Sequence, residues 1–526
     1  MRKTFLLPFL SFTLMMFMAS STIAQIQPKP TLSWQKCIGG TQLDVASSIL
    51  TTFDNAYVVL GATNSTDGDV DSNEGQMDVF IAKLSLTGNI IWKRNFGSSG
   101  DDEGVHFQQT ADSGFIIAAY STFSDGDVDT NYGLRDVWII KLTKTGDIQW
   151  QKTYGGSAND MALTIKQTVD GGYIFAGWSA SSNGDITLNK GFEDCWVVKL
   201  NATGAITWQK TFGGTGEDHF TSITATSDGG YLAVGSVKSN NGDVVGHHGS
   251  DDYWIVKLNS SGNMIWQKTY GGSGQDHCGD HAIAGSVQET FDGGFILSGF
   301  SNSNNGDVVG NHGDYDAWIL KLNSTGNIVW QRSVGGSGDD EAFYIIQMPD
   351  SSYIAAGITN STNGDVDTMY GVYDMWCFKL SPNGTLLWEQ SFGGMFKESA
   401  FALARTNDTS VILAGYSTFP HGQVTGAKGG THDMWVVKLK MTPIINGLPG
   451  INARELTIAP NPTNGFIQVK GGENAVLLKL HNVTGQCVKE SSSHQLSFPE
   501  LPAGIYILKV LDKSGMLLKQ EKIVKL

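Results

Sequence analysis

Tryptophan recurs in this chain at a fixed interval, and that interval constrains the fold more than any other feature. All but one of the 14 tryptophans occupy two positions of a repeating unit. The first position holds Trp34, Trp92, Trp150, Trp208, Trp266, Trp330 and Trp388, which are 58 residues apart except for one interval of 64. The second holds Trp138, Trp196, Trp254, Trp318, Trp376 and Trp435, with Phe80 in the first unit. This period indicates one supersecondary unit copied seven times, each burying its apolar face against its neighbours.

The unit reads as four short strands. In the third copy, β-branched and aromatic runs bounded by Gly, Asp or Asn lie at residues 162–168, 173–177, 195–200 and 206–208. No helical period is present, and glycine-containing tight turns between the runs predict antiparallel neighbours. We therefore predict an all-β chain that begins with a seven-bladed β-propeller. A β-solenoid is the alternative, but its repeats are usually shorter and its strands parallel.

The ends of the repeat region predict how the ring closes. The first unit opens with an outer-strand segment, whereas the seventh ends without one. We expect residues 31–37 to pair with residues 434–440 and to complete the seventh blade, which removes an open sheet edge. Because strands alternate in direction, the long Asn-Gly-Asp loops and the Gly-Gly-Ser interblade loops share one side, here called the long-loop face. Binding residues concentrate on such loops.

Carboxylates recur on this face at three positions of the unit. The first register is Asp44, Asp102, Asp160, Asp218, Asp276, Asp340 and Glu398. The second register is Asp69, Asp127, Asp185, Asp243, Asp307 and Asp365, with Gln423 in the seventh unit. The third register is Asp78, Asp136, Asp194, Asp252, Asp316, Asp374 and Asp433. Recurrence in every unit favours a structural role in which the carboxylates accept backbone N–H bonds.

Two long loops also alternate acidic residues in a pattern that suits calcium. Oxygen ligands at alternate positions fit this hard cation, although the glycine spacing differs from an EF-hand and its bidentate Glu is missing. Calcium is therefore the candidate cofactor, and capped turns without metal are the alternative. The candidate ligands are Asp67, Asp69, Asp71 and Asp78 in the first unit and Asp125, Asp127, Asp129 and Asp136 in the second.

Histidines gather in the fourth and fifth units, where we expect any blade-specific site. Six of the 11 occur there, and we place them on long loops: His219, His247, His248, His277, His281 and His312. The fifth unit also carries an insertion near residues 276–281. No C-x-x-C or H-E-x-x-H motif accompanies these histidines, so solvated loop side chains are the alternative to a metal site.

The remaining tryptophan, Trp178, is the candidate for exposed stacking on a ligand, since the other tryptophans lie within strands and are expected to pack blade against blade. The candidate ligand-binding face consists of Asp160, Asp185, Asp218, Asp243, Asp276, His277, His281, Asp307, His312, Asp340 and Trp178.

Several function classes are disfavoured by composition and motifs. The net charge of −16 argues against nucleic acid or an anionic membrane as a partner. The glycine-rich runs precede strands and lack the Lys-Ser/Thr of a phosphate loop, and no G-x-S-x-G elbow is present. The five cysteines are odd in number and occupy non-equivalent positions, so they predict buried thiols rather than a disulfide framework.

The chain divides into four segments. A basic start, an apolar stretch and small residues predict a secretory signal peptide at residues 1–24, with an uncleaved anchor as the alternative. No other segment is long enough to cross a membrane, so none is expected in the mature chain. The propeller is predicted at 25–440, a Pro/Gly/Asn-rich linker at 441–452 and a small β-sandwich of short alternating strands at 453–526.

The last segment resembles a known export signal. Four motifs occur in order: Pro460, Asn461, Pro462 and Thr463 with Gly465; residues 481–486; residues 501–506, which include Gly504 and Tyr506; and the basic ending 519–525. They resemble the type A C-terminal sorting domain of the type IX secretion system of Bacteroidota. Ala459 departs from the family, which usually has an aromatic residue there. The repeats themselves are similar to propeller repeats in secreted proteins of these bacteria.

This resemblance implies export by the type IX machinery and a place in the medium or on the outer-membrane surface of a Gram-negative Bacteroidota cell. The near-identical blades and the lack of a catalytic constellation favour a non-catalytic binding or adhesion propeller, with a glycan or an extracellular protein as ligand. The alternative is an extracellular polysaccharide hydrolase or lyase with carboxylates on the long-loop face. A purely structural role is a third possibility.

Overall fold

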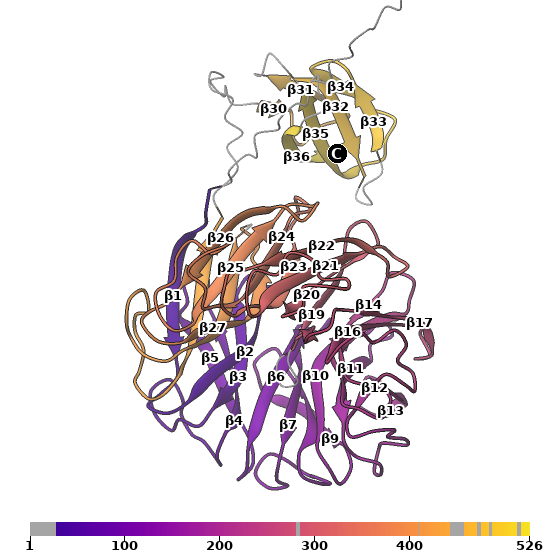
Figure 1. Cartoon of the computed structure of the whole chain (residues 1–526). Helices are drawn as coiled ribbons and strands as arrows, with labels where there is room; N and C mark the ends of the chain where they lie inside the picture. The colour runs from indigo at the N-terminus through magenta and orange to yellow at the C-terminus, as the bar shows by residue number, and fades with distance from the viewer. Residues whose placement is uncertain are drawn as a thin grey trace, which may run out of the picture. The chain divides into compact units, whose positions relative to one another are not determined.

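The computed structural model describes residues 28–279, 284–408, 410–441, 457–470, 475–482, 487–512 and 517–526 (Figure 1). These residues form strands and turns and contain no helix. The chain divides into two compact units, Met1–Pro443 and Ile444–Leu526. The predicted signal peptide and residues 442–452 of the predicted linker lie outside the described residues.

The first unit is a ring of antiparallel sheets in chain order. The first blade comprises β2 (Asp44–Thr51), β3 (Tyr57–Thr63), β4 (Asp78–Leu84) and β5 (Ile90–Phe96). The second comprises β6 (Asp102–Gln109), β7 (Phe115–Ser121), β8 (Asp136–Leu142) and β9 (Ile148–Tyr154). The third comprises β10 (Asp160–Gln167), β11 (Tyr173–Ser179), β12 (Asp194–Leu200) and β13 (Ile206–Phe212). The fourth comprises β14 (Asp218–Ala225), β15 (Tyr231–Val237), β16 (Asp252–Leu258) and β17 (Met264–Tyr270).

The remaining blades follow the same plan. The fifth comprises β18 (Asp276–His277) and β19 (Ser286–Glu289), which together form its first strand, then β20 (Phe295–Ser301), β21 (Asp316–Leu322) and β22 (Ile328–Val334). The sixth comprises β23 (Asp340–Gln347), β24 (Tyr353–Thr359), β25 (Asp374–Leu380) and β26 (Leu386–Phe392). The seventh comprises β27 (Glu398–Arg405), β28 (Val411–Ser417), β29 (Asp433–Lys440) and β1 (Thr31–Ile38). The first strands of successive blades contact one another and form the inner wall.

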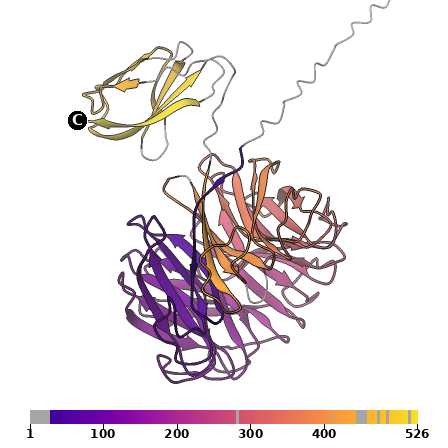
Figure 2. The same cartoon turned by 90° about the vertical axis from the view of Figure 1, so that its left-hand side faces the viewer.

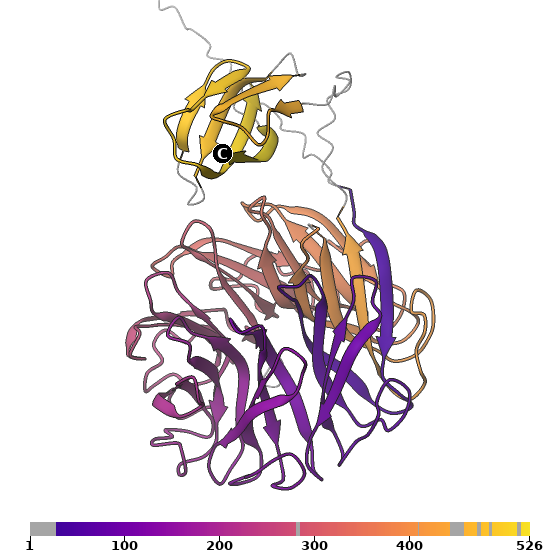
Figure 3. The same cartoon turned by 180° about the vertical axis from the view of Figure 1, so that it is seen from behind.

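The ring closes as the sequence predicts. β1 pairs antiparallel with β29, from Thr31 opposite Lys440 to Ile38 opposite Met434. Figures 2 and 3 show this indigo strand beside the orange strands of the seventh blade. The indole Nε1 of Trp435 donates to Gln35 Oε1 at 2.8 Å, as the equivalent indoles of other blades donate to a glutamine of their own fourth strand. An N-terminal strand therefore completes the last blade.

Apolar clusters fill the spaces between blades. Between the second and third blades, Val137 and Ile139 pack with Phe175 and Trp196. The six tryptophans at the second repeat position are all exposed by 1% or less. At the first position, Trp150 lies 5.8 Å from the ring of Tyr173 in the next blade. Both sets of tryptophans thus hold neighbouring blades together, as the sequence predicts, and truncation of one fully buried tryptophan to Ala costs about 3–5 kcal/mol.

A bulge in the inner strands explains the one irregular repeat. In the third blade the pairing passes from Ala162 opposite Gly177 to Thr164 opposite Ala176, which leaves one residue of β10 without a partner. In the fifth blade His277 pairs with Phe300 and the strand resumes at Ser286. The insertion therefore lengthens an existing bulge and leaves the register of its blade intact.

The second unit is a small β-sandwich. One sheet has the order β30 (Thr457–Ala459), β31 (Phe466–Lys470) and β34 (Gln495–Ser497). The other has the order β33 (Cys487–Ser491), β32 (Ala475–His481), β35 (Gly504–Asp512) and β36 (Leu517–Lys525). Buried side chains from both sheets, including Ile467 and Leu508, share one apolar core. The predicted fold class, an all-β propeller followed by a C-terminal β-sandwich, is confirmed.

Candidate functional site

The carboxylates of the first register start the inner strands and are fully buried. Asp160 accepts hydrogen bonds from Gly156 N at 2.7 Å and from Ser181 Oγ at 2.8 Å. Equivalent bonds from the residue four positions earlier hold Asp44, Asp102, Asp218, Asp276, Asp340 and Glu398. Four of the residues predicted on the ligand-binding face, Asp160, Asp218, Asp276 and Asp340, are therefore placed inside the protein, where they connect each interblade loop to its blade.

The second register joins each long loop to the preceding interblade loop. Asp185, Asp243 and Asp307 accept bonds from the backbone N–H of an interblade glycine at 3.2, 3.1 and 3.3 Å. This contact places both kinds of loop on one face, as the strand directions predict. Asp307 also borders, with His248 and six other residues, an open hollow of about 390 Å³ beside β17.

The third register leaves one oxygen of each carboxylate unsatisfied. Within the described residues, the buried Oδ1 accepts no hydrogen bond in Asp78, Asp136, Asp194, Asp252, Asp316, Asp374 and Asp433. Burial raises the pKa of Asp136 and Asp194 to about 6 and that of Asp374 to about 7, and the first-register carboxylate of the next blade adds to the increase. Glycine is required between the two carboxylates: a Cβ on Gly271 would lie 2.4 Å from Asp252 Oδ1 and 2.6 Å from Asp276 Oδ2.

These raised pKa values predict that the propeller is more stable in mild acid than at neutral pH. A folded-state pKa above that of the unfolded chain means that folding favours the protonated carboxyl, so the stabilisation is present below about pH 4 and is lost as the pH rises through about 6 to 7. Below about pH 4 stability falls again, because a threonine hydroxyl and then a lysine lower the pKa of Asp170 and Asp228 to about 2. The melting temperature should therefore peak between about pH 4 and 5.

The substitution Asp374→Asn isolates this effect at one blade. Asn keeps an acceptor for Tyr370 N, which lies 2.6 Å from Asp374 Oδ2, and removes the charge that faces Glu398. We expect a higher melting temperature at pH 8 and a shallower loss of stability between pH 5 and 8. The same change at exposed Asp129 should alter neither. A wild-type melting temperature that rises steadily from pH 5 to 8 would contradict the interpretation.

The acidic residues proposed as calcium ligands do not converge. Asp67 accepts from Thr41 N at 2.7 Å, Asp71 pairs with Lys93 at 2.8 Å, and Asp78 accepts from Glu74 N at 2.8 Å. Asp69 lies 3.5 Å from Lys428 Nζ.

The second loop is similar. Asp125 accepts from Ser99 N at 2.7 Å, Asp127 from Gly97 N at 3.3 Å and Asp136 from Tyr132 N, while Asp129 is exposed. Among the residues that the structure describes, no group of three or more His, Cys, Asp or Glu side chains could hold a metal ion. The predicted convergence is therefore absent among the described residues, because seven of the eight carboxylates contact separate partners and Asp129 is exposed, and the geometry gives the calcium hypothesis no support.

The histidines do not all lie on loops as predicted. His248 and His312 do, and their Nδ1 atoms lie 2.9 Å from Asp252 Oδ2 and 2.6 Å from Asp316 Oδ2. His219 and His277 are instead the second residues of β14 and β18, because each inner strand begins at its first-register aspartate. His281 lies outside the described residues.

The prediction that Trp178 is exposed is wrong. Its side chain is 5% exposed and packs in β11 with Tyr120 and Met161 at the inner ends of the second and third blades. Its ring lies 5.3 Å from the imidazole of His219. Trp178 therefore supports a histidine from behind and does not offer a stacking surface to solvent.

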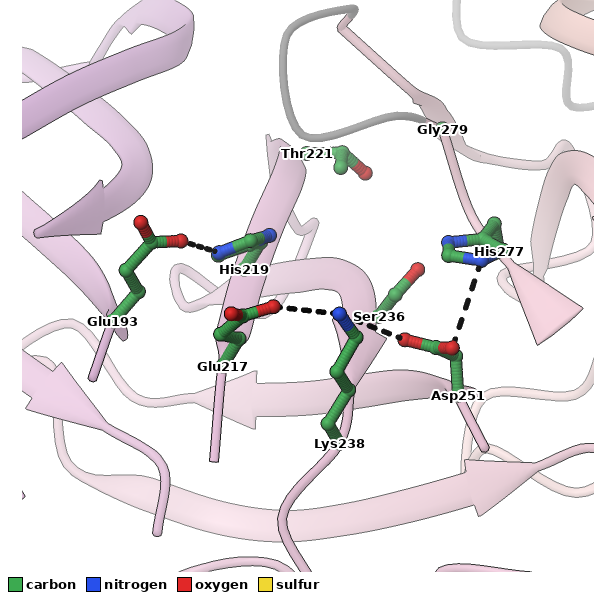
Figure 4. Close-up of a pocket in the computed structure, with 9 residues that line it drawn as sticks. All are labelled: Glu193, Glu217, His219, Thr221, Ser236, Lys238, Asp251, His277 and Gly279. Carbon is green, nitrogen blue, oxygen red and sulfur yellow. Dashed lines mark hydrogen bonds and ion pairs between the residues drawn. The ribbon is translucent and has the colours of Figure 1, made fainter. Parts of the chain in front are cut away.

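His219 and His277 line one cavity of about 300 Å³ between the third, fourth and fifth blades (Figure 4). We call it the interblade pocket, and its lining is Glu193, Glu217, His219, Thr221, Ser236, Lys238, Asp251, His277 and Gly279. The two imidazoles lie on opposite sides, with Lys238 and Asp251 between them. Like His219 on Trp178, His277 is backed by an aromatic ring, since it stacks on Phe300 at 5.1 Å. Aromatic packing thus orients both histidines.

A hydrogen bond and several charge contacts connect the polar groups of the pocket. His219 Nε2 lies 2.5 Å from Glu193 Oε2, and Lys238 Nζ lies 2.6 Å from Glu217 Oε2. Asp251 is more loosely placed, with its carboxylate 4.0 Å from Lys238 Nζ and 3.8 Å from His277 Nε2. Polar and charged side chains from three blades therefore meet in one cavity.

Glu193, Glu217, Lys238 and Asp251 belong to no motif of the sequence, although a signal for two of them exists. The residue before each third-register aspartate varies among the blades: Met77, Arg135, Glu193, Asp251, Tyr315, Tyr373 and His432. Glu193 and Asp251 bridge to Glu217 and Gln275, the residues that precede the inner strands of the next blades. This position is recognisable because its residue varies among repeats that are otherwise similar.

The sorting motif anchors the last strand of the sandwich. Asn461 Nδ2 donates to Lys522 O at 2.6 Å, and Asn461 Oδ1 accepts from Val524 N at 2.9 Å. Thr463 N donates to Val524 O at 2.9 Å, and Tyr506 Oη donates to Pro502 O at 2.8 Å. Gly465 has a φ of 100°, a left-handed conformation that favours glycine. The Pro460–Pro462 segment and its neighbours therefore hold β36 in place.

Comparisons of the chain with known proteins give distant likenesses. The regulatory protein FlaEY of Caulobacter vibrioides is 26% identical over 195 residues, which is 33% of this chain and only 20% of that protein. A copper-bound fungal alcohol oxidase covers 95% of this chain and 100% of its own, with 13% identity and a TM-score of 0.44. BamB from Moraxella catarrhalis covers 94% of this chain and 100% of its own, with 12% identity and a TM-score of 0.35. At this level of similarity the neighbours carry no information on ligand or activity.

The C-terminal unit has a specific match. Residues 457–525 match the family of secretion system C-terminal sorting domains, which confirms the predicted sorting domain. No described segment is a helix of the length and hydropathy needed to cross a membrane. A type IX sorting domain implies interaction with the secretion machinery that recognises it. The chain thus carries a secretion system C-terminal sorting domain, which indicates secretion or attachment at the cell surface.

Proposed function

We propose that this protein is a secreted or cell-surface binding propeller of a Bacteroidota bacterium, which holds a glycan or an extracellular protein at the interblade pocket without transforming it. The observation that carries the proposal is that recurring and blade-specific charged residues lie in different places. The carboxylates that recur in every blade accept hydrogen bonds from the backbone of the long and interblade loops, whereas residues particular to the third, fourth and fifth blades line one cavity.

The properties of this pocket support binding. Its volume of about 300 Å³ lies at the small end of the range of ligand sites. His219 and His277 are backed by Trp178 and Phe300, so little side-chain entropy remains to be lost when a ligand orders them. A site of this size suits recognition of one sugar unit of a glycan or one side chain of a protein.

A polysaccharide hydrolase or lyase is the second candidate, and one contact favours it. The imidazole of His219 and the carboxylate of Glu193 approach to 2.5 Å, a pairing that orients a general base in many enzymes. In an enzyme, His219→Gln would abolish turnover and leave substrate binding largely intact. In a binding protein, the same substitution would change affinity alone.

Ligand arrays test the proposed function. Full-length protein is applied to glycan and extracellular-protein arrays beside the double variant His219→Ala/His277→Ala, with Asp129→Asn as an exposed control on the same face. We expect the hits of the wild type and the control to agree and those of the double variant to weaken or vanish while its melting temperature stays within a few degrees. Hits that persist unchanged in the folded double variant would place the ligand elsewhere. Each hit is then assayed for cleavage.

A further inference from the structure

We infer that the interblade pocket recognises a positively charged group, such as an ammonium or guanidinium, on its ligand. This inference rests on the proposed binding function and adds a chemical class to it. The first observation that supports it is the charge of the pocket lining. Three carboxylates, Glu193, Glu217 and Asp251, face one ammonium, Lys238. With both imidazoles neutral, the formal charge of the lining residues that the structure describes is −2.

Asp251 is the group that a cation would contact. Its side chain is only 4% exposed, yet it points into the cavity (Figure 4). The nearest cationic atoms among the described residues are Lys238 Nζ at 4.0 Å and His277 Nε2 at 3.8 Å, both beyond hydrogen-bond length. A buried carboxylate normally has hydrogen-bond donors at close range, because its desolvation is costly. A donor supplied by a ligand would meet this requirement.

Lys238 compensates the charge of Asp251 only in part, because its short ion pair is with Glu217. Its Nζ lies 2.6 Å from Glu217 Oε2, much closer than to Asp251. A shift of Lys238 toward Asp251 would lengthen the contact with Glu217. The pocket thus keeps an acidic centre with one short ion pair beside it. An ammonium has three N–H donors and a guanidinium has five, enough to bond Asp251 and a second oxygen acceptor at once.

An anionic ligand is disfavoured by the same arrangement. It would have to approach three carboxylates and compete with Glu217 for Lys238 within a partly desolvated space, and like charges in such a site are costly. The chain as a whole carries a net charge of −16, so its field also attracts cations at long range. The charge of the pocket and the net charge of the chain therefore both favour a cationic ligand.

The test uses three sugars of similar size and different charge, added to the full chain. The probes are glucosamine as the ammonium, N-acetylglucosamine as the neutral analogue and glucuronate as the carboxylate, with affinities measured by calorimetry or ligand-observed NMR at pH 7. We expect glucosamine to bind most tightly and glucuronate least, with the preference for glucosamine reduced by added salt. Asp251→Asn should weaken glucosamine binding about tenfold or more.

Two matched variants test whether Asp251 causes the preference for glucosamine. Asp251→Asn preserves shape and removes only the charge, and Asp129→Asn makes the same change on the exposed loop of the second blade. Binding of N-acetylglucosamine should change little in either. Tighter binding of glucuronate, equal binding of all three probes, binding of none, or an unchanged glucosamine affinity in Asp251→Asn would overturn the cationic preference. Array hits lost in the His219→Ala/His277→Ala variant would still uphold the binding function, so the two proposals can fail separately.

Discussion

Deletion of residues 28–38 should open the ring and lower the free energy of unfolding by more than about 5 kcal/mol. β1 supplies the fourth strand of the seventh blade, and its Cys37 and Ile38 are 1% and 0% exposed. Cys37 belongs to the cluster between the sixth and seventh blades and Ile38 to the cluster between the seventh and first. The deletion also removes Gln35, the acceptor of the Trp435 indole, and leaves β29 as an open edge.

Thermal and denaturant unfolding of the deletion variant measure this effect. A peptide with the sequence of the deleted strand provides the control. A synthetic peptide of residues 28–38 should bind the deleted protein and restore much of the lost melting temperature. A peptide with Gln35 and Ile38 both changed to Ala should restore less. An unchanged melting temperature after the deletion would mean that the seventh blade is stable with three strands.

Removal of residues 457–526 should stop transport across the outer membrane and leave the propeller folded. Strands β1 to β29 all lie in the first unit and need no strand from the second. The truncated protein is expected to accumulate in the periplasm with an unchanged melting temperature and an unchanged near-UV circular dichroism spectrum. Cell fractionation and immunoblotting measure its distribution. Normal amounts in the medium or on the cell surface would refute the role of the sorting domain.

A point variant makes the same test with a smaller change. Asn461→Ala removes both side-chain bonds to the backbone of β36, at 2.6 and 2.9 Å, and should impair secretion. Asn464→Ala changes an exposed neighbour and serves as the control. Equal secretion of the two variants would indicate that the machinery does not depend on the anchoring of β36.

The fold was predictable because its determinants recur. Trp150 and Trp196 mark two strands of their unit, and a residue type repeated at one interval reports packing that the unit cannot achieve alone. The closure by β1 followed from counting strands at both ends. Even the burial of first-register carboxylates such as Asp160 agrees with the structural interpretation that recurrence favours.

The pocket was not predictable in the same way, because its residues do not recur. Asp251 occupies a position that holds Arg in one blade and Tyr in two others, so no repeat pattern selects it. The sequence clusters His219 and His277 but predicts them on loops, because the start of a strand at a buried aspartate is not visible in a hydrophobicity pattern. The burial of Trp178 is unpredictable for a related reason: an isolated tryptophan near the end of a strand is buried or exposed according to which side chains of the adjacent blades pack against it.

The bulge in each inner strand has a consequence for how such rings diversify. The bulged residue already stands outside the ladder of hydrogen bonds, so additional residues at that point displace no pairing partner and shift no neighbouring sheet. The fifth blade uses this freedom, and Gly285 N, at the end of its enlarged bulge, donates to Thr221 O of the fourth blade at 3.1 Å. The first strand of every other blade has the same bulge, where residues can be inserted. Residues can therefore be added to the inner strands, by design or by gene duplication and drift, while the scaffold keeps its dimensions.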